Sequence, residues 1–269
     1  MRIAVAASAL SLAFGYSLDG QVALVDRTVT AAGTSIHVRC GGDRGTGPVV
    51  IFEAGAGGDA DHWQPVHAAI AGFARACAYD RPGTGASGPA PAGLTANQYS
   101  AFLRNVLKAA GETPPYVMVG HSFGGIVSSL YASRHASDVA GMVLVDSSHE
   151  DQVRRMEAVF GPPPPPPTPP PAGVPPPPPP GLRFHDFAAA LRAAPFKHDI
   201  PLVVLTGARV RADPEAAKLA PLWLEMQREL AARSARSSHL VLHGAGHFIQ
   251  RDDPQAVVDA VRKVLGQLQ

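Results

Sequence analysis

A serine lies between two glycines in the run Gly120-His121-Ser122-Phe123-Gly124, which matches the pattern G-x-S-x-G. The apolar residues 116–119 before it predict a buried strand, and residues 123–135 predict a helix, so the serine occupies a sharp strand-to-helix turn. Its hydroxyl is then exposed at a helix N-terminus, where the dipole and the free amides favour developing negative charge. The pattern predicts nucleophilic attack on a carbonyl by Ser122, with the backbone amide of Phe123 as a donor to the oxyanion.

A serine nucleophile needs a base, and His247 is the histidine whose surroundings fit best. It lies in the run Gly244-Ala245-Gly246-His247-Phe248, which follows the last predicted strand, 239–242. A Gly-rich loop at that point can present the imidazole to Ser122. His121 is adjacent to the nucleophile in the chain, but neighbouring side chains at a turn point apart, so it is a poor base.

The third group of such a site is a carboxylate, which fixes the imidazole tautomer and stabilises its cation. Asp146 directly follows a predicted strand at 142–145, and Asp213 lies eight residues beyond Leu205, the end of another at 201–205. Both aspartates preserve the chain order serine, aspartate, histidine. The residues by themselves leave both assignments open.

These groups depend on strands and helices that alternate along the chain. This order predicts βαβ units, a mostly parallel sheet and a site at the carboxyl ends of its strands. The predicted strands are 34–40, 48–52, 75–79, 116–119, 142–145, 201–205 and 239–242, and the predicted helices are 95–110, 123–135 and 254–268.

An insertion at about 147–197 interrupts this alternation. Its middle, 161–181, holds fifteen of the chain's 27 prolines. Proline lacks an amide donor and fixes its own backbone angle, so this stretch cannot form a helix or a central strand and is expected as extended polyproline II.

The N-terminus has the composition of an export signal. Met1-Arg2 is followed by an apolar run from Ile3 to Phe14, too short to be a good transmembrane helix. We expect residues 1–15 to be a signal peptide, residues 16–269 to form the α/β domain, and the protein to be secreted or periplasmic. A short N-terminal helix or a truncated gene start, with a cytoplasmic protein, is the alternative.

Composition excludes several other classes of protein. The chain carries 23 basic and 22 acidic residues, a formal net charge of +1, which disfavours a nucleic-acid partner. His149-Glu150 lacks a second histidine at helical spacing, so a zinc peptidase is excluded, and no phosphate loop or dinucleotide fingerprint occurs. We therefore expect no metal and no organic cofactor.

Four motifs taken together resemble the α/β-hydrolase superfamily, most closely its esterase-like, lipase-like and aminopeptidase-like members. The resemblance runs from about Thr28 to the end, apart from the proline-rich segment, and it implies a mostly parallel central sheet flanked by helices, with a lid inserted after the sixth strand. It also implies that the amide of Ala56 is the second oxyanion donor. The motifs are Glu53-Ala54-Gly55-Ala56-Gly57, the run from Tyr79 to Ser87, Gly120 to Gly125, and Gly244 to His247.

The resemblance bears on the choice of acid. Family members usually carry the acid after the seventh strand, in a pattern like G-x-x-D-x-x-x-P, but here Val210 occupies the acid's place between Gly207 and Pro214. Some relatives, including haloalkane dehalogenases, use an acid after the sixth strand, which corresponds to Asp146. We favour Asp146, with Asp213 as the alternative.

The resemblance also gives Cys40 and Cys77 a context. It implies that the strand ending at Cys40 runs antiparallel beside the strand beginning near Arg75, which brings the two cysteines together. In an exported protein we expect a disulfide between them. Two buried free thiols are the alternative.

The function expected from these residues is hydrolysis of a small-molecule carboxylic ester through a Ser-His-Asp acyl-enzyme. Amidase or aminopeptidase, lactonase and carbon–carbon bond hydrolase activities use the same arrangement. The insertion is expected to be an open cover over the site, or else a surface loop without effect. A different class of function is a non-catalytic binding protein whose proline runs dock an aromatic-lined groove of an adaptor.

Overall fold

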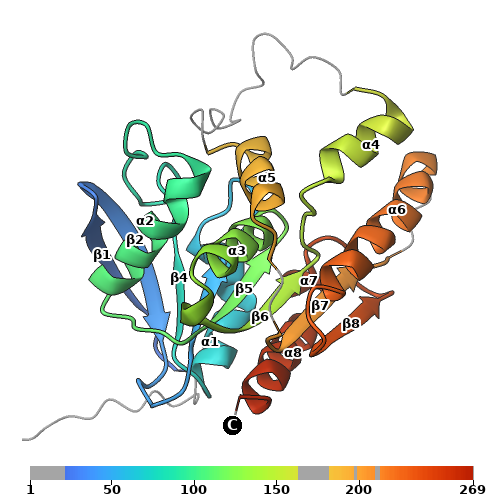
Figure 1. Ribbon diagram of the computed structural model, residues 1–269. Coiled ribbons are helices and arrows are strands. Elements are labelled where there is room, and N and C mark those ends of the chain that lie inside the picture. The colour runs from blue at the N-terminus through green and yellow to red at the C-terminus, as the bar shows by residue number, and fades with distance from the viewer. Residues whose placement is uncertain (1–21, 163–181, 197–198, 210–212, 269) are drawn as a thin grey trace, which may run out of the picture.

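An eight-stranded sheet in the order β1-β2-β4-β3-β5-β6-β7-β8 forms the centre of the computed structural model (Figure 1). The structure describes residues 22–162, 182–196, 199–209 and 213–268, so the expected signal peptide, Val210 and most of the proline-rich segment lie outside the described residues. Of the eight strands, β2 alone runs against the others. The strands are β1 (Val25–Ala31), β2 (Thr34–Gly41), β3 (Val49–Glu53), β4 (Ala76–Tyr79), β5 (Tyr116–His121), β6 (Val139–Val145), β7 (Leu202–Gly207) and β8 (Ser237–Leu242).

Helices cover both faces of this sheet, which confirms the predicted mostly parallel sheet flanked by helices. Among the described helices, none is long and apolar enough to cross a membrane. The helices are η1 (Ala60–Trp63), α1 (Gln64–Ala71), α2 (Ala96–Ala109), α3 (Phe123–Arg134), η2 (Ala136–Asp138), α4 (Gln152–Phe160), α5 (Phe184–Ala193), α6 (Pro214–Ala231), α7 (Ile249–Asp252) and α8 (Pro254–Gly266).

Alternating side chains of the central strands build two separate cores. On β5, Val117 and Val119 belong to the core that α1 and α8 cover, whereas Met118 belongs to the core under α2 and α3. A strand buried on both faces reads as a continuous apolar run, because neither set of side chains meets water. This is why β3 and β5 were predicted within two residues of their observed bounds, whereas β6 begins three residues earlier than expected.

The glycines around Ser122 permit a close approach of backbones at the end of β5. A Cβ atom on Gly120 would lie 2.6 Å from the carbonyl oxygen of Gly124, and one on Gly124 would lie 2.1 Å from the carbonyl oxygen of Glu53. The first contact would force β5 and α3 apart, and the second would force α3 away from the end of β3. The two glycines of the G-x-S-x-G pattern are therefore required by packing at this turn.

The described flanks of the insertion are helical. α5 packs against α2 and α3, and α4 contacts α6 (Figure 1). The Arg155 guanidinium of α4 donates to both carboxylate oxygens of Glu229 on α6, at 2.8 and 2.6 Å. The sequence did not predict β1 or the helices α1, α4, α5 and α6.

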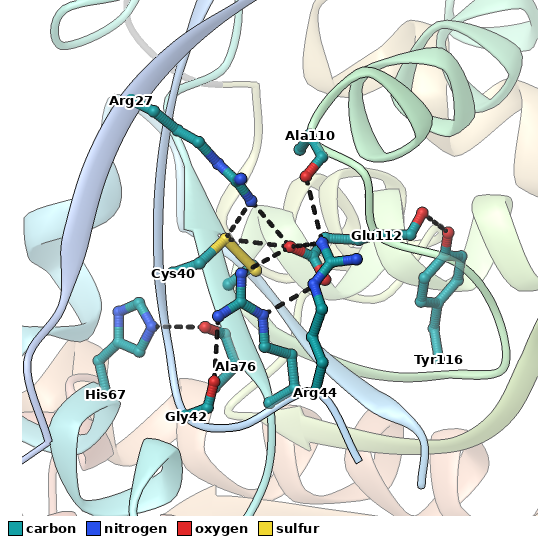
Figure 2. The surroundings of a disulfide bond; sticks show 11 residues. Arg27, Cys40, Gly42, Arg44, His67, Ala76, Ala110, Glu112 and Tyr116 are labelled. Carbon is teal, nitrogen blue, oxygen red and sulfur yellow. Dashed lines mark hydrogen bonds and ion pairs between the residues drawn. A yellow bond between two sulfur atoms is a disulfide. The ribbon is translucent and has the colours of Figure 1, made fainter. Parts of the chain in front are cut away.

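A disulfide joins Cys40 of β2 to Cys77 of β4, which face each other in the antiparallel register (Figure 2). Beside it lies the carboxylate of Glu112, which is 1% exposed and has one oxygen 2.8 Å from each of three guanidinium groups. Burial raises the pKa of Glu112, but the guanidinium groups of Arg75 and Arg44 outweigh burial and hold that pKa below its usual value. This cluster fixes the antiparallel side of the sheet.

Replacing both cysteines by alanine is expected to lower the free energy of unfolding by about 3–4 kcal/mol, the entropy of closing a loop of this length in the unfolded chain. The cysteines are separated by 37 residues. Urea unfolding of the parent and of Cys40→Ala/Cys77→Ala measures the difference, and a reduced parent should match the variant. An unchanged urea midpoint would contradict a stabilising role for the bond.

Candidate active site

Ser122 lies directly after β5, in a backbone conformation that side chains rarely adopt, with φ 51° and ψ −122°. Its amide donates to the carbonyl of Val145 at 3.2 Å, and its own carbonyl accepts from the amides of Gly125 and Ser148 at 2.9 and 3.0 Å. Strained backbone of this kind persists only where surrounding contacts enforce it, and it is concentrated at functional sites. The turn holds Ser122 at the carboxyl edge of the sheet.

His247 lies in the loop between β8 and α7, and its ring bridges two of the predicted site residues. Its Nε2 lies 3.1 Å from the Ser122 hydroxyl oxygen, and its Nδ1 lies 2.6 Å from Oδ2 of Asp146. An imidazole with one nitrogen on a carboxylate and the other on a hydroxyl can take the hydroxyl proton while the carboxylate stabilises the resulting cation.

Asp146 follows β6 and is 3% exposed. Its φ of 42° is also unusual for a residue with a side chain, and its amide donates to the carbonyl of Leu205 at 2.7 Å. Its second oxygen, Oδ1, accepts from the amide of Gly207 at 2.9 Å and from the indole Nε1 of Trp223 at 2.8 Å. The buried carboxylate thus has three hydrogen-bond partners.

The other candidate acid, Asp213, has a different contact. It is the N-cap of α6, where its carboxylate accepts from the amide of Glu215 at 3.0 Å. Between the two aspartates that the sequence left open, the structure brings Asp146 to the imidazole of His247.

Trp223 is a site residue that sequence analysis missed. It lies on α6, 77 residues after Asp146, and its ring also meets that of His247 edge-on, with centroids 6.2 Å apart. Nothing in the local pattern marks it, because a tryptophan at helical spacing is typical of a helix packed on a core. Only the tertiary structure reveals its contact with a carboxylate.

His121 lies behind the nucleophile turn and is buried, as is its neighbour His62. Its Nε2 donates to the backbone carbonyl of His247 at 2.8 Å, and its Nδ1 lies 2.9 Å from Nε2 of His62. Burial, with the nearby rings of His247 and His62, lowers the pKa of His121 to about 3. Burial, with Arg251, lowers that of His62 to about 4, so both rings are neutral near pH 7. His121 therefore tethers the loop that carries His247.

The two backbone amides predicted as oxyanion donors belong to two segments next to Ser122. The amide of Phe123 begins α3, and that of Ala56 belongs to the loop after β3; neither donates to an acceptor within the described ranges. A Cβ atom built on Gly55 would lie 3.5 Å from that of Ser122, so this loop passes beside the serine. Amides without an acceptor in these two segments suit a negatively charged oxygen.

A single group of histidine, cysteine or acidic side chains with metal-ligand spacing occurs among the residues that the structure describes. It consists of Cys40, Cys77 and Glu112, and both sulfur atoms are joined in the disulfide. It lies apart from Ser122, His247 and Asp146.

Comparison with known proteins extends this picture. The model of the alpha/beta hydrolase family matches residues 50–260. Among curated proteins, YqjL of Bacillus subtilis, which is uncharacterized, is 37% identical over 131 residues, or 48% of this chain and 51% of YqjL. The match thus spans about half the length of that relative.

Two solved structures share the fold at low sequence identity. A thermophilic esterase from Thermogutta terrifontis has a TM-score of 0.62 at 20% identity, covering 91% of this chain and 98% of the esterase. An enol-lactonase from Burkholderia xenovorans has a TM-score of 0.62 at 18% identity, covering 89% of this chain and all of the lactonase, 100%. With the family model matching most of the sequence, these findings show that the chain belongs to the α/β-hydrolase family.

Proposed function

We propose that this α/β hydrolase cleaves carboxylic esters of small molecules through an acyl-enzyme formed on Ser122. The observation that carries the proposal is an unbroken series of hydrogen bonds from the Ser122 hydroxyl through His247 to Asp146, at 3.1 and 2.6 Å. Two proteins that share the fold are named an esterase and an enol-lactonase, which supports this class of bond.

The proposed reaction has two acyl-transfer steps. His247 takes the hydroxyl proton as Ser122 attacks the ester carbonyl, and the amides of Ala56 and Phe123 bind the oxyanion. The protonated imidazole then gives its proton to the leaving alcohol. Water, activated by the same histidine, attacks the acyl-enzyme and releases the acid. Amides and lactones can follow the same steps, so the proposal concerns the preferred bond and not an exclusive one.

In this mechanism the Asp146 carboxylate keeps the proton of neutral His247 on Nδ1. Its Oδ2 binds that nitrogen, and its Oδ1 is occupied by the Gly207 amide and the Trp223 indole. With both oxygens engaged, the carboxylate cannot rotate without losing hydrogen bonds. Trp223 is thus proposed as a positioning residue for the acid.

Ser122→Ala and His247→Ala are expected to lower kcat on p-nitrophenyl esters by about four to six orders of magnitude, since each removes a member of a unit that acts together. A fluorophosphonate probe should label the parent and not Ser122→Ala. A panel of acyl chains from acetate to decanoate then defines the substrate preference. A folded parent that neither reacts with the probe nor hydrolyses any ester would instead support a non-catalytic binding protein.

Asp146→Asn and Asp213→Ala separate the two candidate acids. Asp146→Asn is expected to lower kcat by about 10⁴-fold, because an amide favours the wrong imidazole tautomer. Asp213→Ala should leave kcat within about twofold and lower the free energy of unfolding by about 1 kcal/mol, the value of a helix cap. The opposite pattern of kcat values would reject Asp146.

Trp223→Phe tests the indole hydrogen bond. The aromatic ring is kept while the donor to a charged oxygen is lost, so kcat should fall about tenfold or more. Trp63→Phe is the matched control, because the buried indole nitrogen of Trp63 has no hydrogen-bond partner within the described residues. Equal losses of kcat in the two variants would assign the effect to packing.

A further inference from the structure

The turn after β4 carries a buried guanidinium that reaches the loop beside the nucleophile. Arg81 is 7% exposed, and its Nη1 donates to the carbonyl of Ala54 at 2.6 Å. Its Nη2 donates to the carbonyl of Gly55. The guanidinium also lies over the ring of Phe123, 5.4 Å from its centroid. One side chain thus contacts both segments that supply the proposed oxyanion donors.

The Gly55 carbonyl and the Ala56 amide are two ends of one peptide unit. In a planar trans peptide the carbonyl and the N–H point in opposite directions, so fixing one fixes the other. The Gly55 oxygen is held twice, by Arg81 and by the amide of Gly58 at 3.2 Å, across a turn in which Gly57 has a φ of 69°. Gly55 is buried and Ala56 is exposed, so this peptide unit runs from the interior toward the surface of the loop, and its N–H points away from Arg81.

The charge on Arg81 adds to this geometric effect. A hydrogen bond from a cation to a carbonyl polarises the whole peptide unit, and it makes the N–H at the other end a stronger donor. The loop passes beside Ser122, where a Cβ atom on Gly55 would lie 3.5 Å from the serine Cβ. The Arg81 charge can thereby strengthen the hydrogen bond to the reacting carbonyl by polarising this peptide unit, without contact between the arginine and the substrate.

We infer that Arg81 is a positioning residue of the oxyanion hole, which orients and polarises the Ala56 amide through the Gly55–Ala56 peptide bond. The inference rests on the proposed function, because it assigns a role within the same reaction. It predicts that Arg81 acts on the transition state, in which the oxyanion exists, and leaves binding of the neutral ester unchanged.

The carboxylate of Glu53 lies beside Arg81 and balances its charge. Glu53 is fully buried, and its two carboxylate oxygens accept from Arg81 Nη1 at 2.7 Å and from the hydroxyl of Tyr79. The Tyr79 hydroxyl lies 3.0 Å from that of Tyr99, which extends the network. Removing Arg81 alone would leave a buried carboxylate without its partner, which is strongly destabilising. The test must therefore remove both charges together.

The experiment compares Arg81→Met/Glu53→Gln, Arg81→Lys and the parent in ester turnover and in binding of an alkylboronic acid, an analogue of the tetrahedral intermediate. In the double variant, kcat is expected to fall about 10- to 100-fold with KM unchanged, a smaller loss than the 10²–10³-fold of a deleted oxyanion donor. Affinity for the boronic acid should fall by the same factor. Arg81→Lys keeps the positive charge but loses the two parallel donors of the guanidinium. Its kcat should therefore lie between that of the double variant and that of the parent.

Arg75→Met/Glu112→Gln is the control, since it removes an ion pair between a half-buried arginine and a buried glutamate, 2.8 Å apart, beside the disulfide. It should lower the urea midpoint to a similar degree and leave kcat and boronic acid affinity unchanged. Parent-like kcat and boronic acid affinity in Arg81→Met/Glu53→Gln would overturn the inference, as would an equal loss of kcat in the control. A parent without ester turnover or probe labelling would instead mean that the proposed function fails.

Discussion

Two backbone hydrogen bonds between Ser122 and the chain that leaves β6 fix the relation between the candidate nucleophile and its acid. The Ser122 amide donates to the carbonyl of Val145, and the Ser122 carbonyl accepts from the amide of Ser148. These two partners bracket Asp146. The carboxylate and the hydroxyl are therefore held by the same stretch of backbone, and the imidazole has only to fit between them. The positive φ angles of Ser122 and Asp146 are the local cost of this arrangement.

Two of the buried carboxylates, those of Glu53 and Glu112, each form the centre of a charged cluster. Glu53 lies with Arg81 beneath the loop that passes the serine, whereas Glu112 lies with three arginines beside the disulfide. Each carboxylate has a guanidinium partner, which offsets the large desolvation penalty of an ion in the interior. One cluster supports the site, and the other supports the antiparallel strands, so stability and chemistry rest on different groups of charges.

The sequence predicted the parts of this structure that local patterns encode. Apolar runs marked the buried strands, and glycines that no side chain could replace marked the turn at Ser122. β1 was missed because it is a half-exposed outer strand, although Ala32 and Gly33, both with positive φ, form the two-residue turn of a hairpin. The contacts of Trp223 and His121 were beyond prediction, since each joins residues far apart in the chain, and Asp146 was chosen over Asp213 through resemblance alone.

The hydrogen bond from His121 to the His247 carbonyl has a consequence for motion. In the sheet, β5 and β8 are separated by β6 and β7, so twisting of the sheet would by itself change the distance between the loops that follow them. The His121 ring spans this interval and holds the backbone of His247 to the residue before Ser122, at 2.8 Å. This hydrogen bond therefore opposes any bending of the sheet that would draw the base away from the nucleophile.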